Sequence, residues 1–225
     1  MNQVSVGVDG WKKRWVAVAL RDGRFDTIKV FERFEEVLAT FSKAAAIGVD
    51  IPIGMPEEGS READVAAREF LRGSARSVFT VPPRSVLEAP DHASASQLHR
   101  ALCGKGLSKQ SYALKRGIFE VDELVRADDV VIEVHPEASF RELNDGPVPY
   151  SKKSWAGALA RKDLLVKAGI SVPDDIGTAG EVPMDDVLDA AVAAWSARRY
   201  ATGKAESLPS NPPPDARGRL VAIWY

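Results

Sequence analysis

The sequence has only one cysteine, Cys103, so no disulfide can form within the chain. Neither sign of charge dominates, because 30 Lys and Arg residues stand against 32 Asp and Glu residues, giving a net charge of −2. Binding to nucleic acid through bulk positive charge is therefore excluded, and local basic patches remain the open route. A lone cysteine fits a reducing compartment, so we expect cytoplasmic localisation.

Long apolar runs are also missing. No uninterrupted apolar stretch reaches the roughly 20 residues of a membrane-spanning helix, so we expect no membrane partner. The first residues lead into a strand-like segment without a basic and then apolar leader, so we expect no signal peptide. The chain lacks a P-loop, and G-V-D-G is too short for a dinucleotide fingerprint.

The apolar residues that are present alternate or cluster in short β-branched runs, as in buried strands. Three such runs with short turns between them predict an antiparallel meander. A fourth run follows a helix expected over Glu35–Lys43, so it should pair parallel to an earlier strand. The five strands are expected at Val4–Asp9, Trp15–Leu20, Phe25–Phe31, Ala45–Asp50 and Asp129–Val134, with Leu220–Tyr225 as a further edge strand. This order predicts an α/β fold with a mixed five-stranded sheet, three strands antiparallel and two parallel, flanked by helices.

A mainly helical insertion, residues 56–127, is expected between strands four and five of a single domain spanning 1–225. Ser108 should cap one of its helices, and Arg72–Arg84 has the Gly, Ser and Pro content of a loop. The helices are expected at Ser60–Leu71, His92–Leu102, Gln110–Ile118, Pro136–Leu143, Trp155–Ala168 and Met184–Ala201, followed by a Pro-rich connector at Ser207–Pro214.

Carboxylates fall at the ends of these elements. Asp9 ends the first strand and Asp50 ends the fourth, so parallel pairing would set them side by side. Asp186 and Asp189 lie three residues apart near the start of the last long helix and share one helix face. Gathered carboxylates repel one another unless they are protonated or neutralised, and a divalent cation neutralises them. We therefore predict that Asp9, Asp50, Asp186 and Asp189 bind Mg²⁺ or Mn²⁺.

Glu133, near the end of the fifth strand, is predicted to complete the catalytic set with these four acids. Each acid also has a simpler interpretation. Asp9 and Asp50 could be turn acids, Asp186 could favour the helix dipole together with Asp185, and strand alternation could expose Glu133.

Other reactive side chains give weaker indications. His135 could ligate a metal or act as an acid or base, and a local hydrogen-bonding role fits it as well. Arg76 and Arg84 have no acid between them in the 72–84 loop, so they are the predicted phosphate-binding residues. No Ser–His–Asp or Cys–His arrangement stands out.

Several short motifs together resemble one family. They are G-V-D-G-W at 7–11, G-V-D-I-P-I-G at 48–54, R-x-x-D-x-x-A-R at 61–68, S-V-F-T-V-P-P-R at 77–84, I-E-V-H-P-E at 132–137 and D-D-V-L-D-A-A at 185–191. The chain is similar over residues 4–203 to a domain-of-unknown-function family of predicted RNase H-like nucleases. The resemblance implies an RNase H-like domain with an acidic metal site, in which Asp9, Asp50, Asp186 and Asp189 match the acids of Holliday-junction resolvases. Asp50 departs from the Glu usual there, and Glu133 belongs to this family's own motif.

These observations predict a nuclease that hydrolyses the phosphodiester bonds of RNA or DNA at an acidic two-metal site. Two other functions stay open: a phosphotransferase of the actin-like fold that binds ATP, and a non-catalytic RNase H-like interaction module. The sequence assigns no oligomeric state.

Overall fold

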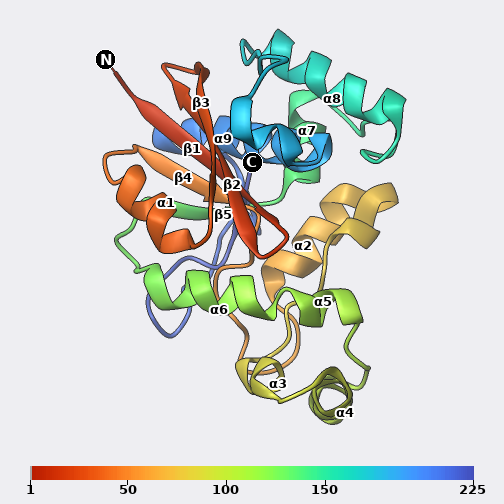
Figure 1. Ribbon diagram of the computed structural model, residues 1–225. Helices are drawn as coiled ribbons and strands as arrows, with labels where there is room; N and C mark the ends of the chain where they lie inside the picture. The colour runs from red at the N-terminus through yellow and green to blue at the C-terminus, as the bar shows by residue number, and fades with distance from the viewer. Residues whose placement is uncertain (1) are drawn as a thin grey trace. The chain divides into compact units, whose positions relative to one another are not determined.

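Short β-branched segments build one sheet in the computed structural model, which describes residues 2–225 (Figure 1). The sheet has seven strands in the order β3-β2-β1-β4-β5-β7-β6. Their bounds are β1 Val4–Trp11, β2 Arg14–Arg21, β3 Arg24–Phe31, β4 Ala46–Val49, β5 Val131–Val134, β6 Ser207–Leu208 and β7 Ile223–Trp224.

The mixed α/β sheet is confirmed, but the prediction of five strands is wrong. As expected, β1 to β3 form an antiparallel meander, and β4 pairs parallel to both β1 and β5. The additional strands are β6, which lies in the segment predicted as a Pro-rich connector, and β7, which lies in the predicted edge strand. Two residues are too few to show any hydrophobic period, so β6 left no strand signal in the sequence.

The predicted helices agree with the structure to within a few residues, except that the stretch predicted as one helix at Gln110–Ile118 is two helices, α5 and α6. The sequence did not predict helix α3 or the 3₁₀ turns at Arg72–Ser77 and Gly177–Glu181. The α-helices are α1 Phe34–Thr40, α2 Glu62–Leu71, α3 Arg84–Glu88, α4 His92–Cys103, α5 Lys109–Ala113, α6 Lys115–Leu124, α7 Pro136–Leu143, α8 Trp155–Lys167 and α9 Met184–Ala201.

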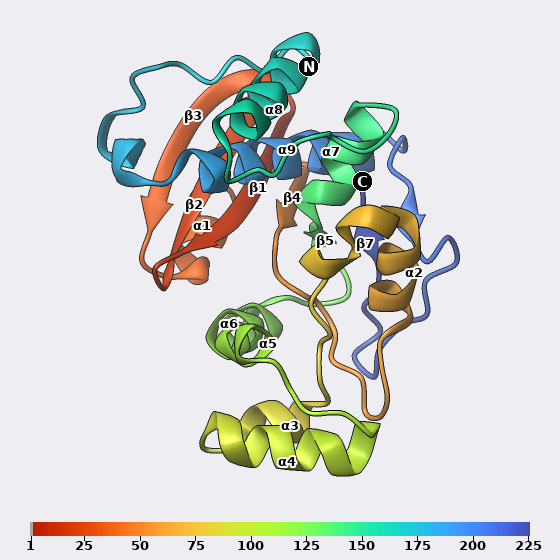
Figure 2. The same cartoon turned by 90° about the vertical axis from the view of Figure 1, so that its right-hand side faces the viewer.

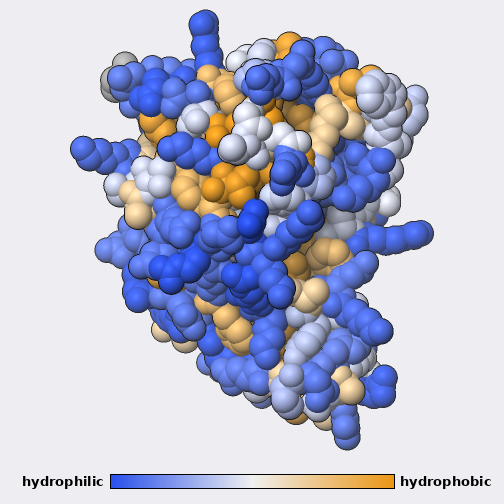
Figure 3. Space-filling model, in the orientation of Figure 1, coloured by the Kyte–Doolittle hydropathy of each residue, from blue (hydrophilic) through white to orange (hydrophobic). Residues whose placement is uncertain are grey.

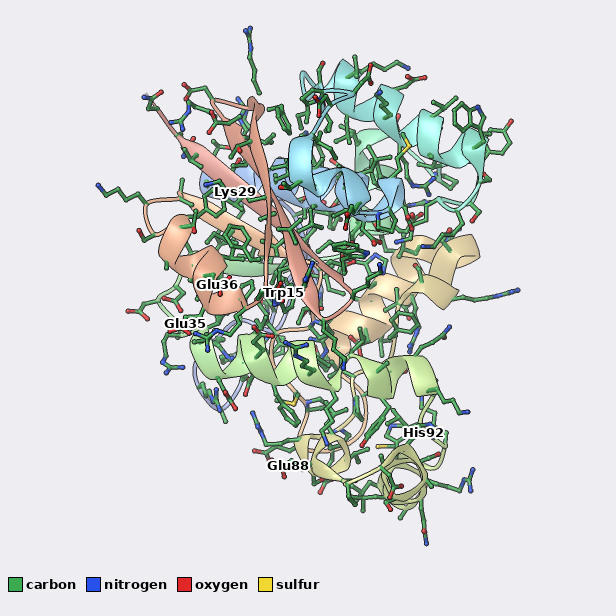
Figure 4. All side chains as sticks on the ribbon, viewed as in Figure 1. Trp15, Lys29, Glu35, Glu36, Glu88 and His92 are labelled. Carbon is green, nitrogen blue, oxygen red and sulfur yellow. The ribbon has the colours of Figure 1, made fainter. Side chains whose placement is uncertain are left out.

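Strand alternation assigns the two faces of the sheet. Val16, Val18 and Leu20 of β2 pack in one core cluster with α9. Trp15 (labelled in Figure 4) precedes Val16 and lies on the opposite face of the strand, where it meets Phe34 of α1 edge to face at 5.2 Å between ring centroids. In Figure 2, α9 crosses one face of the sheet with α7 and α8 beside it, and α1 lies on the other side of the strands.

Two glycines let α9 lie directly on the strands. Gly7 of β1 and Gly48 of β4 are register partners. A Cβ at Gly7 would lie 2.0 Å from the carbonyl oxygen of Ala190, and one at Gly48 would lie 2.8 Å from that of Ala193. The backbone of α9 thus touches the backbone of both strands, and the small alanines of the helix complete a dry interface.

The chain divides into two compact units, which are described separately. The first unit comprises residues 1–51, 130–206 and 224–225, and the second comprises 52–129 and 207–223. In the second unit Arg61 and Asp64 form a buried ion pair at 2.5 Å. Arg61 also donates to the carbonyl of Ile53, and Asp64 accepts from the amide of Val81. The 61–68 motif therefore holds both the segment that precedes it, at Ile53, and the segment that follows it, at Val81.

Local contacts also fix the loop between α4 and α5. The ring of His92 (labelled in Figure 4) lies 2.9 Å from the carbonyl oxygen of Leu107 and packs edge to face on Tyr112. Ser108 caps α5 by accepting from the amide of Ser111, as predicted.

The face of the molecule in Figure 3 is mostly hydrophilic, with apolar side chains in small scattered areas. Within residues 2–225, every helix is too short or too polar to cross a lipid bilayer.

Candidate metal site

Asp9 lies near the end of β1, on the face of the strand that α9 covers. Gly7 and Trp11, two residues to either side, both meet α9 or its core cluster, so alternation turns Asp9 toward the same helix. The side chain is 8% exposed. Its Oδ1 accepts a 2.7 Å hydrogen bond from the amide of Gly10, which fixes the direction of the carboxylate.

Asp50 follows β4 and continues the ladder with β1, because its amide donates to the carbonyl of Val8 at 2.8 Å. It lies two residues after Gly48 and therefore also faces α9. The predicted neighbours on the sheet are thus adjacent in the structure.

Asp189 lies on α9, the helix that covers this face of the sheet. The next residue, Ala190, has its carbonyl oxygen directly over Gly7 of β1, so Asp189 also lies close to the strands. Its side chain is fully buried. Carboxylate oxygens of Asp9, Asp50 and Asp189 all lie within 4.8 Å of one another, and this group is named here the acid cluster.

Lys152 also reaches the acid cluster, although no pattern in the sequence singles it out. Its ammonium forms an ion pair with Oδ2 of Asp189. Oδ1 of Asp189 is buried and accepts no hydrogen bond from the residues that the structure describes. One ammonium thus faces three carboxylates, and one carboxylate oxygen is left available.

The loop that carries Lys152 is held by the buried Arg161 of α8. The guanidinium donates to the carbonyl of Tyr150 at 3.0 Å. It also makes a bidentate pair with Glu137 of α7, from Nε to Oε1 at 3.2 Å and from Nη2 to Oε2 at 2.9 Å. A Cβ at Gly157 would lie 1.9 Å from the carbonyl oxygen of Ser151, so only glycine permits this close approach. Arg161 and Gly157 therefore set the position of Lys152.

Burial dominates the protonation of the acid cluster. It raises the pKa of Asp9 well above its usual value, with further increases from Asp50 and Asp189. It raises the pKa of Asp50 and of Asp189 to about 7 against the opposing effect of Lys152. Burial by itself would lower the pKa of Lys152, but Asp189, Asp50 and Asp9 outweigh it and raise that pKa. The acid cluster therefore keeps part of its protons near neutral pH, and a bound cation would have to displace them.

The other two predicted site acids lie outside the acid cluster. Asp186 is half-buried, and burial followed by the charge of Asp185 raises its pKa. Glu133 is buried on β5 between Ile132 and Val134, which pack against Ala193 of α9. Alternation therefore turns Glu133 to the other face of the sheet, although its charge still contributes to the raised pKa of Asp50.

The predicted phosphate-binding arginines both lie in the second unit. Arg84 forms an ion pair with Asp122 and lies over the ring of Phe119 at 5.4 Å. Arg76 is exposed and lines a pocket. Their role as substrate contacts stays a prediction.

Fold and site together define a mixed α/β protein with a buried carboxylate cluster that could hold a metal ion. The chain matches the model of a family described as "Protein of unknown function (DUF429)" over residues 7–214 and belongs to that family. Comparisons with curated proteins and with solved structures found no match.

Proposed function

We propose that the acid cluster holds Mg²⁺ or Mn²⁺ in an RNase H-like nuclease that hydrolyses phosphodiester bonds in RNA or DNA. The observation that carries this proposal is the meeting of three carboxylates within 4.8 Å, one with a buried oxygen that accepts no hydrogen bond from residues 2–225. Burying ionised carboxylates without enough countercharge costs free energy, and a bound divalent cation offsets that cost by stabilising their charged form.

The donor set fits such an ion. Oxygens bound to one Mg²⁺ lie about 3 to 4 Å apart, so the carboxylates of the acid cluster need only small side-chain rotations. Asp9, Asp50 and Asp189 would be the ligands, and half-buried Asp186 would extend the set toward solvent. The bound ion would supply Lewis-acid activation of a phosphodiester oxygen.

The chain's own residues orient the site in this proposal. The amide of Gly10 holds Asp9, and Lys152 holds Asp189 while presenting the site's positive charge to a phosphate. Arg76 and Arg84 would contact the substrate backbone, as the sequence predicts, whereas Glu133, on the other face of the sheet, would act only through its charge on Asp50. The cytoplasm remains the expected compartment of this activity.

The test is cleavage of a panel of single-stranded DNA, duplex DNA, four-way junction, single-stranded RNA and RNA–DNA hybrid with and without Mn²⁺. We expect Mn²⁺-dependent cleavage of at least one substrate. Asp9→Asn should reduce it by about 10³-fold or more, because the neutral amide removes both a ligand charge and an oxygen lone-pair site.

Asp174→Asn is the matched control, because Asp174 is an exposed acid of the same unit that pairs only with Lys162 among the described residues. It should cleave like the wild type. Equal cleavage by the Asp9→Asn and wild-type proteins, with folding of both verified by circular dichroism, would contradict the proposal.

One observation favours an alternative, the non-catalytic module. The Lys152 ammonium already pairs with Asp189, so a lysine could stand permanently where a cation would bind. Calorimetry with Mn²⁺ separates the two functions, because the module should bind no Mn²⁺.

A thermal shift that requires ATP with Mg²⁺, and is absent with Mg²⁺ alone, would instead favour the phosphotransferase.

A further inference from the structure

A second site lies within the second unit. A pocket of about 260 Å³ opens between the 76–80 segment, α4 and the 105–111 segment. This volume is slightly below the roughly 300–1,000 Å³ of pockets for drug-sized ligands, so it suits a small chemical group. Its lining includes the cationic side chains Arg68, Arg76 and Lys105 and contains no Asp or Glu.

His99 of α4 also lines this pocket and is 1% exposed. Its Nδ1 lies 2.7 Å from the carbonyl oxygen of Lys105, and since a carbonyl only accepts, Nδ1 carries the hydrogen. Its Nε2 is buried and has no hydrogen-bond partner within residues 2–225. Buried polar atoms normally have a hydrogen-bond partner, so Nε2 is available to a polar group that enters the pocket.

Arg68 is held in place at the pocket by its own contacts. Its Nη2 donates to the carbonyl of Val78 at 2.8 Å and to Oγ1 of Thr80 at 2.7 Å, and its Nε also reaches the Val78 carbonyl. These bonds leave Nη1 for a ligand. Arg76 has no ion pair or hydrogen bond within the described part of the chain, and its exposed side chain can close over the pocket.

The 104–108 loop fixes the position of Lys105, the third cationic residue of the pocket. Besides the contact of its carbonyl with His99, Lys105 precedes a glycine, at which a Cβ would lie 2.9 Å from Oγ of Ser96. Oγ of Ser96 also accepts from the amide of Leu107 at 3.1 Å. The loop is therefore tied to α4 on both sides of Lys105.

We propose that this pocket binds a phosphate group through Arg68, Arg76 and Lys105, with Nε2 of His99 accepting a hydrogen bond from a hydroxyl of the phosphate. Guanidinium groups match the geometry of phosphate oxygens, and a pocket without carboxylates presents no repelling charge. The site lies entirely in the second unit and does not depend on the acid cluster.

The test is calorimetric titration with inorganic phosphate in EDTA at low ionic strength, against chloride of matched ionic strength. EDTA removes divalent cations, so the result is independent of the proposed nuclease. We expect phosphate to bind the wild-type protein, and Arg76→Ala and His99→Asn each to weaken binding by about tenfold or more. Asn keeps a donor for the Lys105 carbonyl and removes the atom at the Nε2 position.

Arg116→Ala is the matched control, because Arg116 is an exposed arginine of the same unit outside the pocket. It should bind phosphate like the wild type. Equal binding by Arg76→Ala, Arg116→Ala and wild type would overturn the proposal, as would the absence of phosphate binding to the wild type. Arg76 is exposed, so this comparison holds even if His99→Asn fails to fold.

The source of the phosphate is assigned by a second titration with a trinucleotide that carries either a 5′-phosphate or a 5′-hydroxyl. If the 5′-phosphorylated trinucleotide binds at least about tenfold tighter than inorganic phosphate, and the 5′-hydroxyl form loses this extra affinity, the ligand is the phosphorylated end of a nucleic acid. Equal binding of both trinucleotides at a level below inorganic phosphate would assign a small phosphorylated molecule.

Discussion

Lys152 changes the chemistry of the acid cluster more than any other single residue near it. Its charge lowers the pKa of both Asp50 and Asp189 more than any other group does, against the opposing effect of burial. An ammonium and a divalent cation would compete for the same carboxylate oxygens. We therefore expect the lysine to stabilise the acid cluster without metal and to weaken its affinity for metal.

Lys152→Met tests this competition. Methionine keeps much of the side-chain volume and removes the charge, so Mn²⁺ affinity should rise about tenfold, or ~1.4 kcal/mol. Metal-free stability should fall, because the buried carboxylates lose their one counterion. Calorimetry measures the affinity, and urea denaturation in EDTA measures the stability.

Lys153→Met is the matched control, because the adjacent lysine is 70% exposed and pairs with Asp185 outside the acid cluster. It should leave Mn²⁺ affinity within about twofold of wild type, as expected for an exposed ion pair. Weaker Mn²⁺ binding by Lys152→Met would mean that the lysine supports the metal site and does not compete with it.

At the residue scale, local signals predict that Asp9, Asp50 and Asp189 meet in space, and the structure brings these three together. Asp9 and Asp50 each follow a β-branched run, and helical spacing sets Asp189 beside Asp186. Asp186 is predicted in the same group but lies outside the acid cluster. Lys152 reaches Asp189 across 37 residues, and Arg84 reaches Asp122 across 38. No periodicity connects such positions, so the partners could not be paired from the sequence.

At the scale of elements, the paired glycines decide where α9 lies. Because Gly7 and Gly48 are register partners, no side chain separates α9 from the backbones of β1 and β4 at these two positions. Asp189 reaches the sheet edge only because the helix lies this close to the strands. We therefore expect the geometry of the acid cluster to depend on this glycine pair.

Gly7→Ala should destabilise the protein by about 3 kcal/mol or more, because its Cβ would lie 2.0 Å from the Ala190 carbonyl oxygen. The displaced helix should also weaken Mn²⁺ binding. Urea denaturation and calorimetry measure the two effects.

Gly10→Ala is the comparison, since a Cβ there would meet only the ring of Trp15, at 4.0 Å. Its stability should stay within about 1 kcal/mol of wild type. Similar stabilities for Gly7→Ala and Gly10→Ala would show that α9 can move away from β1 at little cost.

Element prediction succeeded where the segments were long. The α9 helix begins and ends at the predicted residues, because it is eighteen residues long and a glycine, Gly203, follows shortly after its end. The break between α5 and α6 falls at Leu114, which keeps helical backbone angles, so no Gly or Pro marks it in the sequence. The glycine contacts with α9 were likewise invisible, because they depend on tertiary approach.

At the scale of the whole molecule, the raised pKa values link stability to pH. The folded protein holds protons on Asp50 and Asp189 up to about pH 7, whereas an unfolded aspartate releases its proton near 3.9. Their contribution to stability is fully present below about pH 4 and is lost as the pH rises through 7.

We therefore expect the metal-free protein to lose about 4 °C or more in melting temperature between pH 5 and pH 8, measured by calorimetry in EDTA. Saturating Mn²⁺ should remove most of this loss, because the ion replaces the protons on the acid cluster. The double variant Asp50→Asn, Asp189→Asn should show a smaller loss in EDTA. A melting temperature that rises from pH 5 to pH 8 without metal would contradict this linkage.

The acid cluster combines three rigid supports with one loop. Asp9 and Asp50 extend from paired strands, Asp189 extends from a helix seated on them, and only Lys152 comes from a loop. A cation entering the cluster would meet ligands already in place and one ammonium that must withdraw. The speed of metal uptake would then be governed by how often the 150–154 loop lifts its lysine, whatever the final affinity.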